Sequence, residues 1–287
     1  FVGDRGKVLY EQGCGRVERT LIESVFNQCK SAEGPGFHVR YWNNLDRSGE
    51  PVATAQLTTP FQLCTSGATV FAPGVNLTDF SATYSSVFTP QKKGEVSLNL
   101  YVNGMGRLRI NGEEVMTYKQ NHGVRNKNYV LKAEAGKSYE IELDFEYLHN
   151  DAQLNFDLGV KRDVDIRRSV EAVKEADIVI FAGGISPSLE GEEMGVDLPG
   201  FKRGDRTDIE LPAVQRELIA ALHCAGKKVI LVNCSGSPVG LEPETRACEA
   251  ILQAWYPGQA GGTAVAEVLF GDYNPAGRLP VTFYRNV

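Results

Sequence analysis

The chain has 287 residues, of which 42% are hydrophobic and 23% are charged. This composition is typical of a globular protein, and the length is enough for two domains with sizeable cores. The formal net charge of −6 excludes the basic surface with which proteins bind nucleic acids or anionic membranes. No apolar run approaches the roughly 20 residues that a membrane-spanning helix needs. The six cysteines include no C-x-x-C pair, so neither a zinc site nor a dense disulfide framework is indicated.

The first thirty residues are predicted to contribute one strand and one helix. Residues 7–14 (KVLYEQGC) form a short apolar run that ends near a glycine, which is typical of a strand. Residues 19–30 carry apolar side chains at helical spacing. The following stretch, SAEGPG (31–36), has the composition of a linker.

From Phe37 to about Gly159 the pattern is β-like, with short alternating runs separated by turn signals. Asn111–Gly112 lies between two such runs and predicts a β-hairpin with a type I′ turn. Short strands at this spacing indicate a β-sandwich or a β-barrel.

The last part of the chain alternates helices and strands. Helices are expected at 165–176, 213–226 and 261–271, and strands at 178–181, 227–234 and 249–256. Regular alternation of this kind predicts a parallel, doubly wound sheet. We therefore expect an α/β fold, a parallel-sheet sandwich with flavodoxin-like layering. Residues 1–34 and 162–287 would form this domain, and residues 35–161 would be an inserted all-β sandwich.

A long charged loop follows the predicted strand at 178–181. In α/β sheets, ligands bind at the carboxyl ends of the strands, where this loop begins. Its motif LEGEEM (189–194) places Glu190 and Glu192 two residues apart, with Glu193 adjacent. A solvated acidic loop is the plain interpretation. The chemical alternative is a carboxyl group that donates a proton, with its pKa raised by burial or by a neighbouring carboxylate.

Other motifs near the loop are weaker. Gly183–Gly184 follows a predicted strand but lacks the G-x-G-x-x-G spacing of a dinucleotide site. The chain contains no G-x-S-x-G motif, and its four histidines do not cluster, which argues against a serine hydrolase. Arg206 lies further along the loop, where it can pair with an acidic side chain and hold the loop around a ligand.

Several motifs together resemble a known family. FAGGISPSLEGEEM, DRTDIELPAVQRELI, VILVNCSGSPV and AWYPGQAGGTAVAEVLFGDYNPAGRLPVTFY are similar, in order and spacing, to the C-terminal α/β sandwich domain of glycoside hydrolase family 3. That family includes β-glucosidases and β-xylosidases. The inserted region resembles the PA14 β-sandwich that some members carry, through FHVRYW, ATYSSVFTPQKKGEVSLNLYVNGMGRLRINGEEV and LKAEAGKSYEIELDF.

The resemblance implies a retaining exo-β-glycosidase that removes terminal β-linked glucose or xylose from oligosaccharides or glycosides. It uses two carboxyl groups, a nucleophilic Asp from an N-terminal (β/α)8 barrel and an acid/base Glu from the LEGEEM loop. By the family pattern Glu192 is favoured as the acid/base and Glu190 is the alternative, with Glu193 and Arg206 as substrate contacts.

The expected barrel would be a partner from the same chain, and without it we expect residues 1–287 to be inactive alone. The resemblance implies no metal, no organic cofactor, no nucleic-acid or membrane partner, and a periplasmic or secreted location. The competing hypothesis is a carbohydrate-binding or structural module without a catalytic role.

Overall fold

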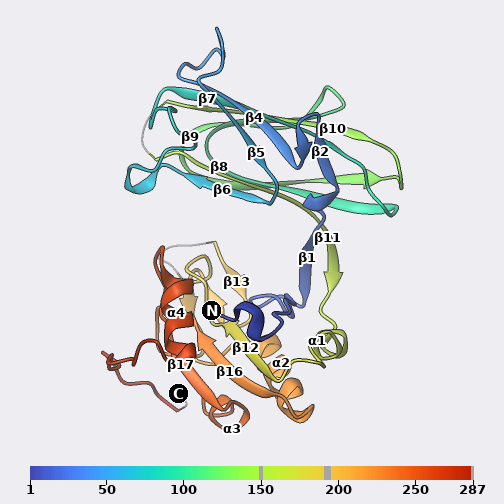
Figure 1. Ribbon diagram of the computed structural model, residues 1–287. Helices are drawn as coiled ribbons and strands as arrows, with labels where there is room; N and C mark the ends of the chain where they lie inside the picture. The colour runs from blue at the N-terminus through green and yellow to red at the C-terminus, as the bar shows by residue number, and fades with distance from the viewer. Residues whose placement is uncertain (149–150, 191–194, 286–287) are drawn as a thin grey trace. The chain divides into compact units, whose positions relative to one another are not determined.

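The computed structural model describes residues 1–148, 151–190 and 195–285. The chain divides into two compact units (Figure 1). Residues Phe1–Leu21 and Asp163–Val287 form the parallel unit, and residues Ile22–Arg162 form the antiparallel unit. No helix among the described residues is long and apolar enough to cross a membrane.

The antiparallel unit is built on one large curled sheet of eleven strands (Figure 1). Its main path runs in the order β1-β11-β8-β10-β7-β2-β3, with β9 on β8, β6 on β11, and β4 and β5 beside β7. The strands are β1 Thr20–Ser24, β2 Cys29–Ser31, β3 Gly34–Pro35, β4 Phe37–Trp42, β5 Ala53–Leu57, β6 Phe61–Cys64, β7 Phe80–Phe88, β8 Gly94–Ile110, β9 Glu113–Ala133, β10 Tyr139–Tyr147 and β11 Gln153–Asp163.

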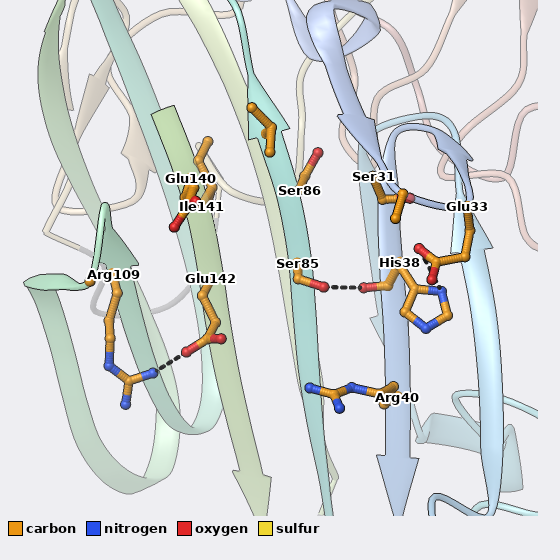
Figure 2. A pocket seen from close by; sticks show the side chains of 13 residues that line it. Ser31, Glu33, His38, Arg40, Ser85, Ser86, Arg109, Glu140, Ile141 and Glu142 are labelled. Atoms are coloured by element: carbon orange, nitrogen blue, oxygen red, sulfur yellow. Dashed lines mark hydrogen bonds and ion pairs between the residues drawn. The ribbon is translucent and has the colours of Figure 1, made fainter. Parts of the chain in front are cut away.

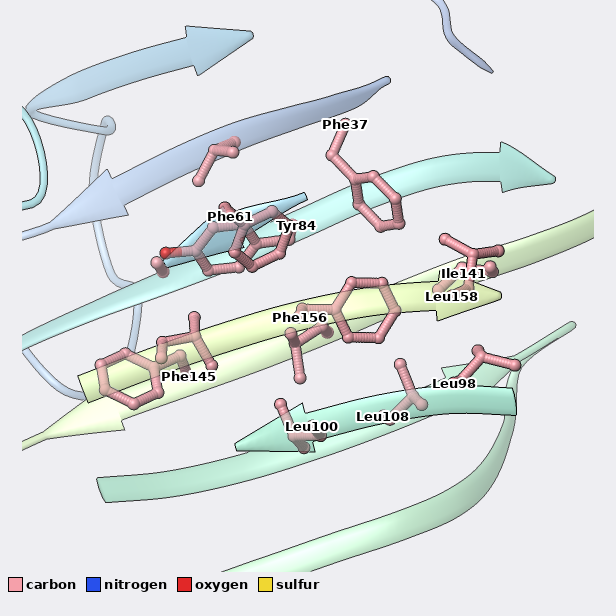
Figure 3. Packing of buried hydrophobic residues seen from close by; sticks show 14 of the residues in the cluster. Phe37, Phe61, Tyr84, Leu98, Leu100, Leu108, Ile141, Phe145, Phe156 and Leu158 are labelled. Carbon is pink, nitrogen blue, oxygen red and sulfur yellow. The ribbon is translucent and has the colours of Figure 1, made fainter. Parts of the chain in front are cut away.

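Alternation along these strands separates a buried face from an outer face. On β10, Ile141, Leu143 and Phe145 are at most 1% exposed, whereas the residues between them face outward. The buried face is rich in aromatic rings, which stack or meet edge to face around Phe61 and Phe156 (Figure 3). Such rings bury large apolar areas, and their stacked and edge-to-face arrangements add further stabilisation. The inside of the curled sheet is therefore the core of this unit.

The predicted hairpin at Asn111–Gly112 is confirmed. These two residues join β8 to β9 and both have positive φ, 51° at Asn111 and 80° at Gly112. Asn and Gly are the residues that tolerate this conformation best, which is why the dipeptide marks a type I′ turn.

The parallel unit holds a sheet of three parallel strands in the order β12-β16-β17. A second small sheet, of three two-residue strands, lies within the charged loop. The elements are α1 Ile166–Ala172, β12 Ile178–Gly183, β13 Asp197–Leu198, β14 Phe201–Lys202, β15 Asp205–Arg206, α2 Ala213–Cys224, β16 Lys228–Asn233, α3 Glu244–Ala247, β17 Ala250–Gln253 and α4 Gly261–Phe270. Short 3₁₀ turns lie at Gly3–Arg5, Phe26–Gln28 and Ser66–Ala68.

The predicted fold class is wrong. In the described part of the chain, most strands belong to the large curled sheet, whose pairing is mainly antiparallel, and helices are few. The named strands that pair in parallel there are β12, β16 and β17. The chain is thus not a parallel-sheet α/β sandwich with flavodoxin-like layering. The helix–strand alternation in residues 165–271 accounts for only these three parallel strands, whereas the large curled sheet holds eleven strands.

The prediction for the first thirty residues is also wrong. Residues 7–14 form no strand, and the expected helix at 19–30 is replaced by β1, a 3₁₀ turn and β2. Leu21 in β1 and Phe26 in the 3₁₀ turn, two of the residues that gave the helical spacing, are buried at 3% and 1% exposure. Tertiary pairing has overridden local periodicity here, because β2 gains a hydrogen-bonded partner in β7.

Candidate active site

The carboxyl ends of the three parallel strands form one edge. The strands pair in register, so that Gly183 of β12, Asn233 of β16 and Gln253 of β17 lie side by side. The loops that follow these residues therefore start from the same edge, where α/β sheets bind their ligands.

Glu190 lies above this edge, in the loop after β12. The preceding residue, Leu189, is 3% exposed and packs in a buried cluster with Ile185 and Phe201. Phe201 belongs to β14, so the small sheet in the charged loop anchors the chain on either side of the acidic motif. The Glu190 carboxylate itself is half-buried.

Both oxygens of the Glu190 carboxylate accept hydrogen bonds from loops of the neighbouring strands. The Ser237 hydroxyl, after β16, donates to Oε1. The Tyr256 hydroxyl, after β17, donates to Oε2 at 3.3 Å. Three consecutive strands of the sheet thus each contribute one residue to this site.

Arg206 fixes the direction of the bond from Ser237. Its guanidinium donates to Ser237 Oγ at 3.2 Å, to the carbonyl oxygen of Pro238 at 2.8 Å and to that of Glu210 at 3.2 Å. A hydroxyl that accepts from a cation directs its own proton elsewhere, here to Glu190. Burial lowers the pKa of Arg206, and the nearby Glu190 carboxylate opposes that shift.

A buried amide network supports the loop that carries Ser237. Asn233 and Ser235 are fully buried. The Asn233 amide donates to Ser235 Oγ at 2.9 Å and to Gln253 Oε1 at 2.6 Å, and the Gln253 amide donates to the Ser235 carbonyl oxygen at 3.2 Å. Buried hydrogen bonds of this kind hold the groups they join in place, whereas Asn233 Oδ1 has no hydrogen-bond partner among the described residues. The loops after β16 and β17 are therefore held to each other.

Tyr256 reaches Glu190 because a glycine leaves room for its ring. A Cβ atom at Gly236 would lie 2.3 Å from the Tyr256 ring. Burial raises the pKa of Tyr256, and the Glu190 carboxylate raises it further. The phenol is therefore protonated at neutral pH and available as a donor.

Gly183–Gly184 has a packing role at this edge. Gly184 has φ of 120°, and a Cβ atom there would lie 2.5 Å from the carbonyl oxygen of Cys234. The Gln215 side chain bridges the same backbone, accepting from the Gly184 N–H at 2.8 Å and donating to its carbonyl at 2.9 Å. The glycine pair allows the ends of β12 and β16 to approach each other closely.

Of the predicted site residues, the structure brings Glu190 and Arg206 into one cluster. Glu192 and Glu193 lie outside the described residues. The sequence analysis gave no role to Ser237 and Tyr256, which lie within the motifs VILVNCSGSPV and AWYPGQAGG. Their positions directly after two of the parallel strands were the available signal. Within the described ranges, no three His, Cys, Asp or Glu side chains converge to hold a metal ion.

The fold and the site together define a class of protein, one in which an α/β unit presents an anchored carboxylate at the carboxyl edge of its sheet. Residues 4–287 match the Glycosyl hydrolase family 3 C-terminal domain. The chain belongs to this family.

Named relatives are glycoside hydrolases. Over 285 residues the chain is 46% identical to the xylan 1,4-beta-xylosidase of Xylanibacter ruminicola, covering 98% of this chain and 33% of that protein. Over 122 residues it is 42% identical to the periplasmic beta-glucosidase of Salmonella typhimurium, covering 42% of this chain and 15% of that protein. The chain thus spans about a third of the length of the first of these relatives.

Among solved structures, the chain is similar to the beta-glucosidase of Kluyveromyces marxianus in complex with glucose. The TM-score is 0.58 at 22% identity, and the likeness covers 97% of this chain and 34% of that one. At this identity the likeness shows the fold alone.

Proposed function

We propose that this chain is the part of a retaining exo-β-glycosidase that supplies the acid/base carboxyl group from the LEGEEM loop. The observation that carries the proposal is Glu190, a half-buried carboxylate held at the carboxyl edge of the parallel sheet by Ser237 and Tyr256. The names of the relatives support β-linked xylose or glucose as the sugar removed. The 46% identity to a xylosidase makes xylose the first choice.

In the proposed mechanism, the acid/base carboxyl protonates the glycosidic oxygen while a nucleophilic Asp attacks the sugar. The same carboxylate then takes a proton from the water that hydrolyses the glycosyl-enzyme. The Asp would come from a (β/α)8 barrel outside this sequence, about 5–5.5 Å from the acid/base. Residues 1–287 alone would then be inactive, because they lack the nucleophile.

The contacts of Glu190 indicate where its proton would reside. Because Arg206 donates to Ser237, the Ser237 proton points to Oε1. Among the described residues, the hydrogen-bond partner of Oε2 is the Tyr256 phenol, which can accept as well as donate. A proton on Glu190 would therefore occupy Oε2, and Tyr256 would turn its own proton away.

The sequence favoured Glu192 over Glu190 as the acid/base. We now place Glu190 first because its carboxylate is held in a defined cluster, and we keep Glu192 as the alternative. Glu193 and Arg206 remain proposed substrate contacts. For Arg206, the described contacts support a role in orienting Ser237.

The domain assignment and the location are also proposals. We retain the proposal of one discontinuous domain around a PA14-like insertion, expected from the sequence at 1–34 with 162–287 and at 35–161. The compact units of the structure divide instead after Leu21 and after Arg162. The periplasmic name of one relative supports a periplasmic or secreted location.

Kinetics of the longer parent protein test the proposal. Wild type, Glu190→Ala and Glu192→Ala would be compared on xylobiose and on an aryl β-xyloside. Loss of the acid/base should lower the rate on xylobiose by roughly 10²- to 10⁴-fold, and less on the aryl glycoside, whose leaving group needs little protonation. The proposal fails if neither substitution changes the rate on xylobiose. A loss confined to Glu192→Ala would transfer the role to that residue.

A further inference from the structure

The outer face of the antiparallel sheet carries a polar cavity of about 490 Å³. It lies across β4, β7, β10 and the end of β8 (Figure 2). Strand register places His38, Ser85 and Glu142 in one row, with Arg109 next to Glu142. The volume lies within the range of small-ligand sites.

At one end of the cavity, hydrogen bonds between lining side chains and their neighbours fix the positions of those side chains. Arg109 donates to Glu142 Oε1 at 2.5 Å and to Asp144 Oδ2 at 2.9 Å. Asp144 is 9% exposed and also accepts from the Thr83 hydroxyl at 2.8 Å. These contacts fix the Arg109 and Glu142 side chains at one end, while the Ser85 hydroxyl lies on the floor between them and His38 (Figure 2).

Two lining groups lack a charged partner among the described residues. Arg40 is exposed, and its guanidinium lies over the Trp42 ring, 5.4 Å from the centroid. Glu140 is also exposed, and its described hydrogen bonds with Asn111 are made by its backbone, the N–H donating to the Asn111 side chain and the carbonyl accepting from the Asn111 N–H, both at 2.9 Å. The cavity therefore offers a free donor group and a free acceptor group in addition to its hydroxyl floor.

The charges of the cavity select the kind of ligand. Its lining carries three carboxylates, Glu33, Glu140 and Glu142, against two guanidinium groups, Arg40 and Arg109. A phosphate or another anion would meet more negative than positive charge. A neutral ligand with many hydroxyl groups can donate to the carboxylates and accept from the guanidinium groups.

We propose that this cavity is a binding site for a neutral oligosaccharide, separate from the Glu190 site because it lies wholly within the antiparallel unit. Sugar binding in this cavity requires no catalysis and therefore goes beyond the proposed function. The proposed function enters only in the choice of xylotriose as the probe sugar. Binding here would attach the parent protein to a polysaccharide while hydrolysis proceeds at the proposed catalytic site.

Titration calorimetry of residues 1–287 with xylotriose tests the proposal. Arg40→Met removes a donor and Glu140→Ala an acceptor, and both side chains are exposed. We expect each substitution to weaken binding, Arg40→Met by about tenfold, since hydrogen bonds to charged groups are of that strength. Arg167→Met, an exposed arginine of α1 in the other unit, is the matched control and should bind as the wild type does.

A second variant separates this site from the catalytic edge. Glu190→Gln should leave xylotriose binding to the cavity intact, whatever its effect on hydrolysis by the parent protein. The proposal is overturned if xylotriose does not bind to the wild-type chain, or if Arg40→Met and Glu140→Ala bind as tightly as the control. Binding that is lost only in Glu190→Gln would place the sugar at the sheet edge and would also overturn it. Melting curves of each variant check that the fold is unchanged.

Discussion

The two units of the chain bury their apolar side chains to very different extents. In the antiparallel unit, Phe156 is 2% exposed among other aromatic rings. In the parallel unit, Ile178 and Ile180 of the edge strand β12 are 53% and 50% exposed, and α4 has no buried residue. Apolar burial is the main stabilising term in folding. We infer that the antiparallel unit is the more stable one, and that the proposed acid/base sits on the less buried scaffold.

A core substitution should show the largest difference between the units. Phe156→Ala leaves a cavity among packed rings and should lower the free energy of unfolding by about 3–5 kcal/mol. Ile180→Ala removes a side chain that is already half exposed and should cost about 1 kcal/mol or less. Denaturant titration of both variants measures the two losses. Equal losses of unfolding free energy would contradict the inferred difference in stability between the units.

A buried ion pair in the parallel unit should make one substitution there nearly as costly to the free energy of unfolding as the core substitution. Glu244 is 1% exposed and is held by Arg216, with 2.7 Å between Nε and Oε1. Arg216→Met would leave this carboxylate buried without its partner, at a cost of about 3 kcal/mol or more. Arg246→Met, which breaks an exposed pair with Glu242, is the control and should leave the unfolding midpoint unchanged. An equally small loss of unfolding free energy in both variants would show that Arg216 does not stabilise the buried Glu244 carboxylate.

Alkaline pH should act mainly on the antiparallel unit. Burial raises the pKa of Tyr41 to about 12 and raises that of Tyr84 well above its ordinary value. An unfolded tyrosine has a pKa of about 10, so the stabilisation is complete below pH 10 and is lost as the pH rises through the folded value. The loss from Tyr41 should be about 2 kcal/mol by pH 12. Unfolding free energies across this range should show less loss in Tyr41→Phe, whereas the exposed Tyr273→Phe should follow the wild type.

The smallest expected effect concerns the positioning of Glu190. Ser237→Ala removes the donor to Oε1 and leaves Arg206 with its two carbonyl partners. In the parent protein we expect kcat on xylobiose to fall about tenfold at an unchanged melting temperature. A purely structural role would lower the melting temperature and leave the kcat of the folded protein unchanged. Ser237→Thr, which keeps a hydroxyl, should recover most of the activity.

The local elements were more predictable than their assembly. The helices α1, α2 and α4 and the strands β16 and β17 follow from apolar spacing and from glycines such as Gly271, which has φ of 80°. The overall fold class did not follow, because pairing of β2 with β7 depends on residues nearly sixty positions apart. Periodicity in a single segment carries no information about such partners.

The candidate site was predictable in its location and only partly in its composition. The rule that ligands bind at the carboxyl ends of strands led from β12 to the loop that holds Glu190 and Glu192, with Glu192 favoured as the acid/base. It applies equally to the loops after β16 and β17, yet Ser237 and Tyr256 have no distinctive motif. Their roles depend on the parallel register that sets the three loops side by side.

The most direct test of the acid/base assignment is the product formed when azide is added to the parent protein with an aryl β-xyloside. Removal of the acid/base leaves a glycosyl-enzyme that water attacks slowly, because no base activates the water, whereas azide needs no base. We predict that Glu190→Ala regains turnover with azide and forms β-xylosyl azide, whereas the wild type forms xylose. No azide adduct from Glu190→Ala, or an adduct from Glu192→Ala alone, would contradict the assignment.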